Sequence, residues 1–85
     1  PETADHLATD ERLHERTALL ELIDARKALL DKRCQPAGYN IGINVGAAAG
    51  QTIAHLHVHL IPRYPGDVAD PRGGVRGVIP EKQKY

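Results

Sequence analysis

The sequence contains no tryptophan, phenylalanine or methionine, and it has only three tyrosines and one cysteine, Cys34. The shortage of aromatic rings argues against a binder of single-stranded nucleic acid, because such proteins stack bases on aromatic side chains. A single cysteine excludes a disulfide within the chain and a zinc site with four cysteine ligands. The composition therefore predicts a small domain with few large side chains available for a core.

An excess of one charge is also missing, since 11 lysines and arginines balance 11 aspartates and glutamates in 85 residues. A basic surface that would attract nucleic acid or an anionic membrane is therefore not expected. No apolar run approaches the roughly 18 residues of a membrane span, and no signal-peptide pattern opens the chain. These absences predict one small cytoplasmic domain without nucleic-acid or membrane partners.

Glycine is absent from residues 1–37, and this part of the sequence predicts a helix over about residues 9–34. Thr9 is a suitable N-cap, and two acidic residues follow it where the helix dipole favours negative charge. Pro36 and Gly38 end the pattern. Leucine and isoleucine recur at helical spacings through the segment, at Leu13, Leu19, Leu20, Leu22, Ile23, Leu29 and Leu30.

Apolar and polar residues alternate over about residues 39–45 and again over about 53–61, which predicts two strands. The small residues of the segment 46–52 suit a loop between antiparallel neighbours. Residues 62–85 contain several prolines and glycines and predict an irregular tail. The fold expected from this order is α+β, with a long helix packed on an antiparallel sheet.

Three histidines, His55, His57 and His59, alternate with apolar residues in the second predicted strand. Side chains of a strand alternate between its faces, so the three imidazoles are expected on one face. Such a polar stripe is costly in a core, which favours a functional role. Metal binding is one hypothesis, because imidazole is a ligand of zinc, copper, iron and nickel. Acid–base or nucleophilic chemistry on phosphate is the other.

The loop before the histidines favours phosphate chemistry over a metal site. Gly46 and Gly50 allow the backbone to approach an anion, and Asn44, Gln51 and Thr52 add neutral hydrogen-bonding groups. A metal site gains nothing obvious from these residues, and no carboxylate follows at a helpful spacing. A metal-binding strand remains open as an alternative.

The segment from Gly50 to Arg63 resembles the signature of the histidine triad (HIT) superfamily, in which three histidines alternate with apolar residues. Within the superfamily it is most similar to the fragile-histidine-triad and dinucleoside polyphosphate hydrolase branch. The resemblance implies a HIT-like fold whose N-terminal strands are absent from this sequence. Residues 1–85 are thus interpreted as the C-terminal portion of a single HIT domain.

The resemblance also implies a reaction: transfer of a nucleotidyl group from the α-phosphate of a nucleotide or dinucleoside polyphosphate to a histidine, followed by hydrolysis. His57 matches the nucleophile, and His55 and His59 match its catalytic neighbours. Asn44, Gly50, Gln51 and Thr52 match positions that bind substrate. Phosphoramidase activity is compatible with this chemistry. No cofactor is required, although Mg²⁺ can accompany a polyphosphate as its counterion.

Two further expectations concern association and turnover. Two strands and one helix are marginal on their own, and relatives in the HIT family are commonly dimers, so a homodimer or a complex with a separate N-terminal half is expected. Because half of the family's nucleotide pocket has no counterpart in this sequence, a nucleotide-binding module without efficient turnover is the main alternative to an enzyme.

Overall fold

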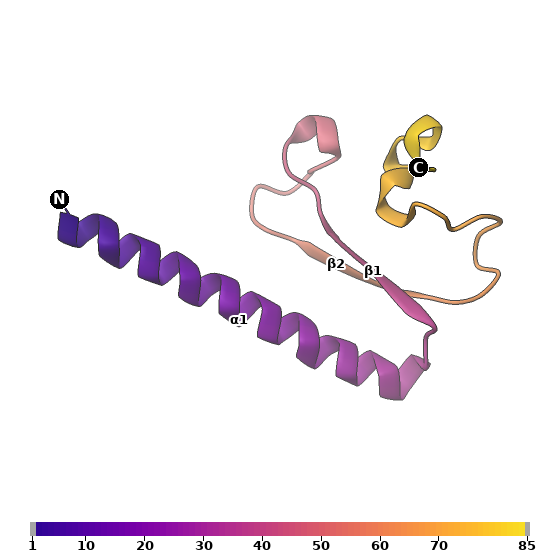
Figure 1. Ribbon diagram of the computed structural model, residues 1–85, viewed down its shortest axis with the longest axis horizontal. Helices are drawn as coiled ribbons and strands as arrows, with labels where there is room; N and C mark the ends of the chain where they lie inside the picture. Colours follow the sequence, from indigo (N-terminus) through magenta and orange to yellow (C-terminus); the bar gives the residue numbers. More distant parts are fainter. Residues whose placement is uncertain (1, 85) are drawn as a thin grey trace. The chain divides into compact units, whose positions relative to one another are not determined.

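The computed structural model describes the backbone of residues 2–84 and the side chains of residues 11–84. Along this part of the chain, helix α1 spans Glu2–Cys34, strand β1 spans Gly38–Ile43 and strand β2 spans Val58–Arg63. Three short 3-10 helices complete the order: η1 at Ala47–Ala49, η2 at Gly74–Val78 and η3 at Pro80–Lys82. The chain forms two compact units that divide after Arg33, one helical and one containing both strands and the tail (Figure 1). The α+β content expected from the sequence is confirmed.

Helix α1 is longer at its N-terminus than predicted, because it begins at Glu2 and not after Thr9. Thr9 lies inside the helix, so its assignment as the N-cap was wrong. Residues 2–8 include good helix formers and neither glycine nor proline, so nothing stops the helix there. The C-terminus at Cys34 agrees with the prediction; Gln35 takes a left-handed φ of 49° and Pro36 follows.

Strands β1 and β2 form an antiparallel two-stranded sheet in a register that runs from Gly38 opposite Arg63 to Ile43 opposite Val58. Facing residues of an antiparallel pair project to the same side of a sheet. One side therefore carries the pairs Gly42–His59 and Asn40–Ile61. The other carries mainly apolar residues: Tyr39, Ile41, Ile43, Val58, Leu60 and Pro62. The predicted separation of a histidine-bearing face from an apolar face holds within β2.

Both strands are displaced from their predicted positions. β1 ends at Ile43, two residues earlier than expected, and β2 begins at Val58, five residues later. After Ile43 the chain turns into the loop that contains η1, so residues 53–57 have no partner strand there. Alternation alone could not reveal this, because a strand also needs a neighbour for its hydrogen bonds. The predicted irregular tail likewise begins late, since β2 continues to Arg63, and it contains η2 and η3.

Arg63 fixes the end of β2. Its guanidinium donates to both carboxylate oxygens of Asp67, at 2.7 and 2.8 Å, and also to Oδ1 of Asn40 on β1. Asp67 additionally accepts from the backbone N–H of Tyr64, at 3.0 Å. The Tyr64 hydroxyl in turn donates to the carbonyl of Cys34, at 3.1 Å. These contacts tie the turn after β2 to β1 and to the segment that enters it.

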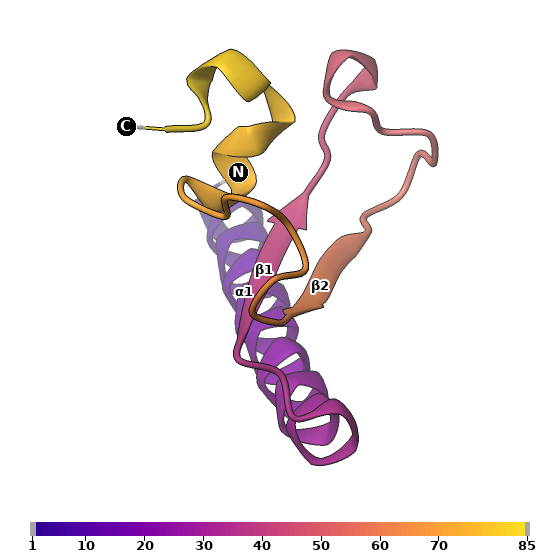
Figure 2. The same ribbon diagram turned by 90° about the vertical axis from the view of Figure 1, so that its right-hand side faces the viewer.

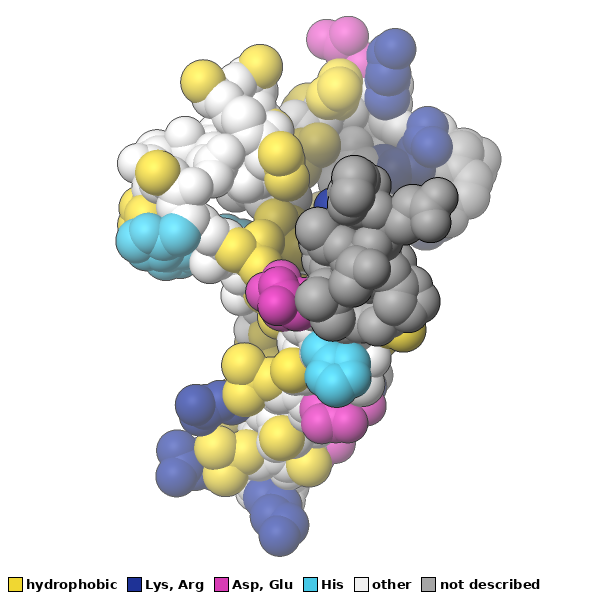
Figure 3. Space-filling model, turned by 90° about the vertical axis from the view of Figure 1, so that its left-hand side faces the viewer, with side chains coloured by type: hydrophobic (Ala, Val, Ile, Leu, Met, Phe, Trp, Pro, Cys, Tyr) yellow, Lys and Arg dark blue, Asp and Glu magenta, His cyan; other side chains and the backbone are white. Residues whose placement is uncertain are grey.

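None of the described side chains, residues 11–84, is fully buried. On α1, Leu13, Leu20 and Leu22 are each more than half exposed. Hydrophobic side chains are accordingly visible on the molecular surface between charged ones (Figure 3). Among the described helical residues, no helix has the length and apolar character needed to cross a membrane. Both units therefore present apolar surface that the described residues do not cover.

The Arg63–Asp67 contact should make stability depend on pH. Hydrogen bonds from Arg63, and then from the Tyr64 backbone, hold the pKa of Asp67 well below its ordinary value of about 3.9. A carboxylate with a lowered folded-state pKa contributes its full stabilisation above its unfolded pKa of about 4, and this contribution is lost progressively as the pH falls from there toward the lower folded-state pKa. We expect Asp67→Asn to be less stable than wild type at pH 7, with the difference shrinking below pH 4.

Urea unfolding followed at pH 7, 5 and 3 measures this difference. Asp24→Asn on α1 makes the same chemical change away from the contact and serves as the control. A difference between wild type and Asp67→Asn that stays constant from pH 7 to pH 3 would contradict the role given to this ion pair.

Candidate functional site

The loop between the strands is held by its own backbone hydrogen bonds. The N–H groups of Ala49 and Gln51 both donate to the carbonyl of Gly46, each at 3.1 Å, and Gly50 N–H donates to the carbonyl of Ala47 at 3.0 Å. Gly46 and Gly50 adopt φ values of 89° and 90°, which residues with a side chain rarely adopt. The N–H of Gly50, which the sequence suggested for anion binding, is therefore used inside the loop. Gly50 contributes to the site by its backbone conformation and its lack of a side chain.

The side chain of Gln51 connects the two ends of this loop. Its Oε1 accepts a hydrogen bond from the N–H of Gly46 at 2.7 Å, and its Nε2 donates to the carbonyl of Ile53 at 2.9 Å. Both polar atoms of the amide are thus engaged by the backbone. The sequence placed Gln51 among the substrate-binding residues, and that role stays a prediction; the observed bonds show that its side chain holds the two ends of the loop together.

The three histidines do not lie on one strand, so that prediction was wrong for two of them. His59 is in β2, opposite Gly42, whereas His55 and His57 lie in the segment of bends and coil before it. The rings of His55 and His57 are nevertheless stacked, with centroids 5.4 Å apart and planes inclined by 25°. The bent segment therefore keeps these two imidazoles together without a sheet neighbour.

All seven residues predicted for the site line one cleft of about 280 Å³, together with Ile53. Beside the histidines, the lining consists of residues from the loop and the segments that flank it: Asn44, Gly50, Gln51 and Thr52. Figure 2 shows the loop, with η1 at its tip, following β1, and the segment that returns from it to β2. The structure thus brings together the residues that the sequence separates by up to 15 positions.

The chemistry of this cleft is that of neutral donors and acceptors. Imidazole, amide and hydroxyl groups line it, and no carboxylate is among the lining residues. The imidazole rings are exposed, so a ring nitrogen can reach an incoming phosphorus atom, and neighbouring N–H groups can donate to phosphate oxygens. Such a lining suits a substrate that carries several negative charges.

The structure gives less support to a metal centre. In the part of the chain that the structure describes, no three histidine, cysteine, aspartate or glutamate side chains are placed to hold one metal ion. The stacked arrangement of His55 and His57 turns ring faces, and not ring nitrogens, toward each other. The metal-binding alternative consequently lacks an observed set of ligands and stays a hypothesis.

Sequence reasoning missed the polar contacts beside the site. The Oδ1 of Asn40 accepts a hydrogen bond from Arg63, a contact that the alternation of the predicted strand does not indicate. The guanidinium of Arg63 is engaged by Asp67 and Asn40. The spacing of four between Arg63 and Asp67 was the signal available, because a turn after a strand can bring such residues together.

Comparison with known proteins identifies a family. The sequence model of the HIT-domain family matches residues 3–66 of this chain. The chain is 53% identical over 34 residues to an AP-4-A phosphorylase of Mycobacterium tuberculosis and 40% identical over 60 residues to a 16.1 kDa HIT-like protein of Mycoplasma pneumoniae. It is 38% identical over 56 residues to a bis(5′-nucleosyl)-tetraphosphatase (asymmetrical) of Schizosaccharomyces pombe. No solved structure matches the chain.

These matches cover only parts of the proteins compared. They include 39%, 71% and 66% of this chain, respectively, but 17%, 40% and 31% of the three relatives. The chain thus spans less than half the length of the relatives it matches. Its interpretation as the C-terminal portion of one domain over residues 1–85 stays a prediction.

The positive φ of Gly50 generates a prediction about the loop. A Cβ at Gly50 meets no atom within 4 Å, so the effect of Gly50→Ala isolates the backbone conformation. Alanine in the left-handed region costs on the order of 1–2 kcal/mol. We expect Gly50→Ala to lower the free energy of unfolding by about that amount and to weaken any ligand binding in the cleft.

Gly38→Ala is the matched control, because Gly38 also has open space for a Cβ but lacks a positive φ. Denaturant unfolding at one protein concentration gives both values. Equal stability of the two variants would show that the loop tolerates a side chain at Gly50 and that its conformation is not under this constraint.

Proposed function

The chain belongs to the HIT-domain family, and from this premise we propose that it is a nucleotide hydrolase or nucleotidyl transferase acting through a histidine. The substrates proposed are nucleotides and dinucleoside polyphosphates, attacked at the α-phosphate. One observation supports the proposal most: all seven residues implied by the resemblance line a single cleft. Two relatives, named AP-4-A phosphorylase and bis(5′-nucleosyl)-tetraphosphatase, are consistent with a nucleotide substrate.

In the proposed first step, a ring nitrogen of neutral His57 attacks the α-phosphorus. The N–P bond forms while the bond from phosphorus to the leaving oxygen breaks, and that oxygen takes the electron pair. A neutral imidazole carries a lone pair on one ring nitrogen, which makes that nitrogen an available nucleophile. The product is a nucleotidyl-histidine and a free phosphate, polyphosphate or nucleoside polyphosphate.

In the second step a water molecule attacks the same phosphorus. Its O–P bond forms, the N–P bond breaks, the water proton is released and His57 regains its electron pair. His55 and His59 are proposed to donate hydrogen bonds to the phosphate oxygens and to the leaving oxygen. Asn44 and Thr52 add neutral polar contacts, and Gln51 maintains the loop through its bonds to Gly46 and Ile53.

The scheme needs no cofactor in its bond-making steps. Mg²⁺ accompanying a polyphosphate substrate is compatible with it, because such ions bind phosphate oxygens while keeping several waters. A cytoplasmic location belongs to the same proposal.

His57→Asn tests the assignment of the nucleophile. Asparagine retains a polar side chain but has no ring nitrogen to attack phosphorus, so we expect release of mononucleotide from a dinucleoside tetraphosphate to fall at least about 10³-fold. His14→Asn, on α1 and outside the cleft, makes the same substitution as a control and should leave the rate within about twofold. Binding of a non-hydrolysable analogue by both variants shows that the cleft is intact.

The outcomes separate enzyme from binding module. Equal slow rates for wild type and His57→Asn, with normal analogue binding, would favour a nucleotide-binding module without turnover. Rapid quench followed by intact-mass measurement of the wild type should show a nucleotidyl adduct that His57→Asn lacks.

We also propose that the chain functions as a homodimer. Leu13 and Leu20 lie seven residues apart on α1, hence on one face, and are 60% and 63% exposed. Apolar surface of this kind favours association when two copies can cover it. Sedimentation equilibrium at micromolar concentration should give a mass of about twice the 9.3 kDa of one chain.

The double variant Leu13→Glu/Leu20→Glu should shift the sedimenting species toward monomer, because two like charges would meet across the contact. Glu21→Gln, a substitution on the same helix off that face, is the control. A folded wild-type monomer at these concentrations would contradict the homodimer.

A further inference from the structure

A second hollow lies in the same unit, between the sheet and the tail that follows β2. It encloses about 1140 Å³ and is lined by residues of both strands and of the segment 68–83. η2 contacts β1, and Figure 2 shows the tail beside that strand. Asn44 and His59 line the hollow as well as the cleft, so the two spaces adjoin at these residues.

The lining of the hollow is mainly apolar. Ile61 projects from the same face of β2 as His59, and Val75, Val78 and Ile79 come from the tail. These four side chains are between 49% and 82% exposed. An apolar, concave surface with few polar groups is typical of a site for a small organic ligand.

Six polar side chains line the hollow; Asn44 and His59 are shared with the cleft, and Arg63 and Asp70 are engaged in ion pairs. The other two are the amides of Asn40 and Gln83. Asn40 uses Oδ1 to accept from Arg63, and its Nδ2 has no acceptor among the residues that the structure describes. Gln83 uses Nε2 to donate to the carbonyl of Asp70 at 3.1 Å, which leaves its Oε1 as an acceptor. One free donor and one free acceptor beside apolar walls suit a nucleobase, which is a flat ring with hydrogen-bonding edges.

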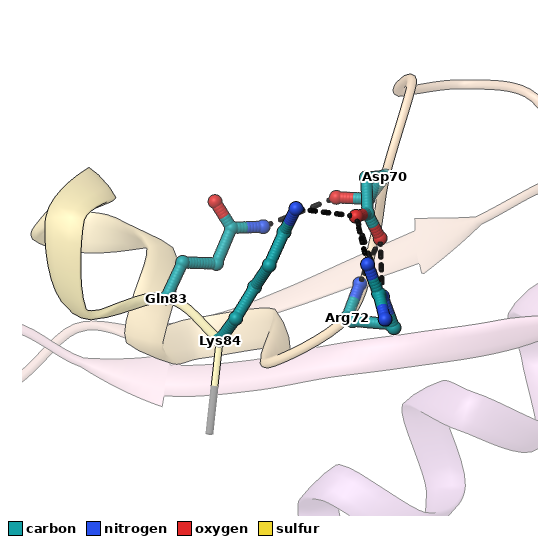
Figure 4. A network of polar contacts seen from close by, with 4 residues as sticks. All are labelled: Asp70, Arg72, Gln83 and Lys84. Atoms are coloured by element: carbon teal, nitrogen blue, oxygen red, sulfur yellow. Dashed lines mark hydrogen bonds and ion pairs between the residues drawn. The ribbon is translucent and has the colours of Figure 1, made fainter.

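The wall formed by the tail is fixed by specific contacts (Figure 4). The Asp70 carboxylate accepts from Arg72 Nη2 and from Lys84 Nζ, both at 2.9 Å. Gly73, with a φ of 87°, allows the backbone of Gln83 to approach so closely that a Cβ would lie 1.6 Å from its carbonyl oxygen. The chain thus closes on itself from Asp70 to Lys84 and presents a defined surface to the sheet.

We propose that this hollow binds the nucleoside of the leaving group. The inference rests on the proposed function: when His57 attacks a dinucleoside polyphosphate, the departing fragment is a nucleoside polyphosphate. Its phosphates adjoin the cleft at His59, and its nucleoside occupies the space under the tail. The tail is therefore a specificity element that distinguishes leaving groups with a nucleoside from inorganic polyphosphate.

A single tryptophan can report occupancy, because the sequence contains none. In the full chain carrying Val78→Trp, we expect saturable quenching of fluorescence by a nucleoside triphosphate and at least about tenfold weaker binding of inorganic tripolyphosphate. Val45→Trp is the matched control, since Val45 is a similarly exposed valine that does not line the hollow. Its fluorescence should not respond.

A kinetic test uses Val75→Phe, which adds volume inside the hollow. We expect the KM for a dinucleoside tetraphosphate to rise at least about tenfold. The kcat/KM for a nucleoside 5′-tetraphosphate, whose leaving group has no second nucleoside, should stay within about twofold. An equal loss for both substrates would indicate a structural role only and would overturn the proposal.

The two experiments distinguish the proposals from each other. If the chain turns over substrate but Val78→Trp shows no quenching, the proposed nucleoside site is rejected and the proposed hydrolase activity is retained. Quenching without turnover would support the site and reject the hydrolase. A fluorescence change that follows protein concentration and not nucleotide would show that a second copy of the chain occupies the hollow, which also overturns the proposal.

Discussion

The antiparallel ladder between β1 and β2 determines where the functional groups of the second unit lie. At the end where Ile43 faces Val58, the chain opens into the loop and the bent histidine segment. At the other end, Arg63 faces Gly38 and joins the turn after β2 to the sheet. Since none of the described side chains is fully buried, backbone pairing and local polar contacts, and not a core, hold these groups in place.

The sequence was most informative about which residues belong together and least informative about where elements end. Residue types and family resemblance predicted the seven members of the cleft. The alternation of histidines correctly indicated that His59 and Val58 lie on opposite faces of β2. It could not show that His55 and His57 lack a partner strand. The helix start was missed because Thr9 has the chemistry of a cap wherever it lies. The hollow was not foreseen, since the apolar residues of the tail follow no regular period.

Charged and neutral groups are separated within this unit. The Asp67 carboxylate pairs with Arg63, and the Asp70 carboxylate pairs with Arg72 and Lys84. Neither carboxylate lines the cleft. A carboxylate beside the histidines would repel a polyanionic substrate and would also favour protonated imidazole. Neutral amides and backbone groups shape the loop instead, as in the two bonds of Gln51. The arrangement keeps the cleft free of negative charge while using ion pairs to hold the tail and the strand end.

The loop that shapes the cleft also has a consequence for the order of folding. Ile43 and Val58 are the paired residues nearest to each other in sequence, so closing the loop between them costs less chain entropy than forming any other pair of the ladder. The internal bonds of Gly46 shorten that loop further, and the remaining pairs can then form one after another toward Gly38 and Arg63. Substitutions that break these internal bonds would therefore slow the nucleation of the sheet, so changes in the lining of the cleft are coupled to the folding rate.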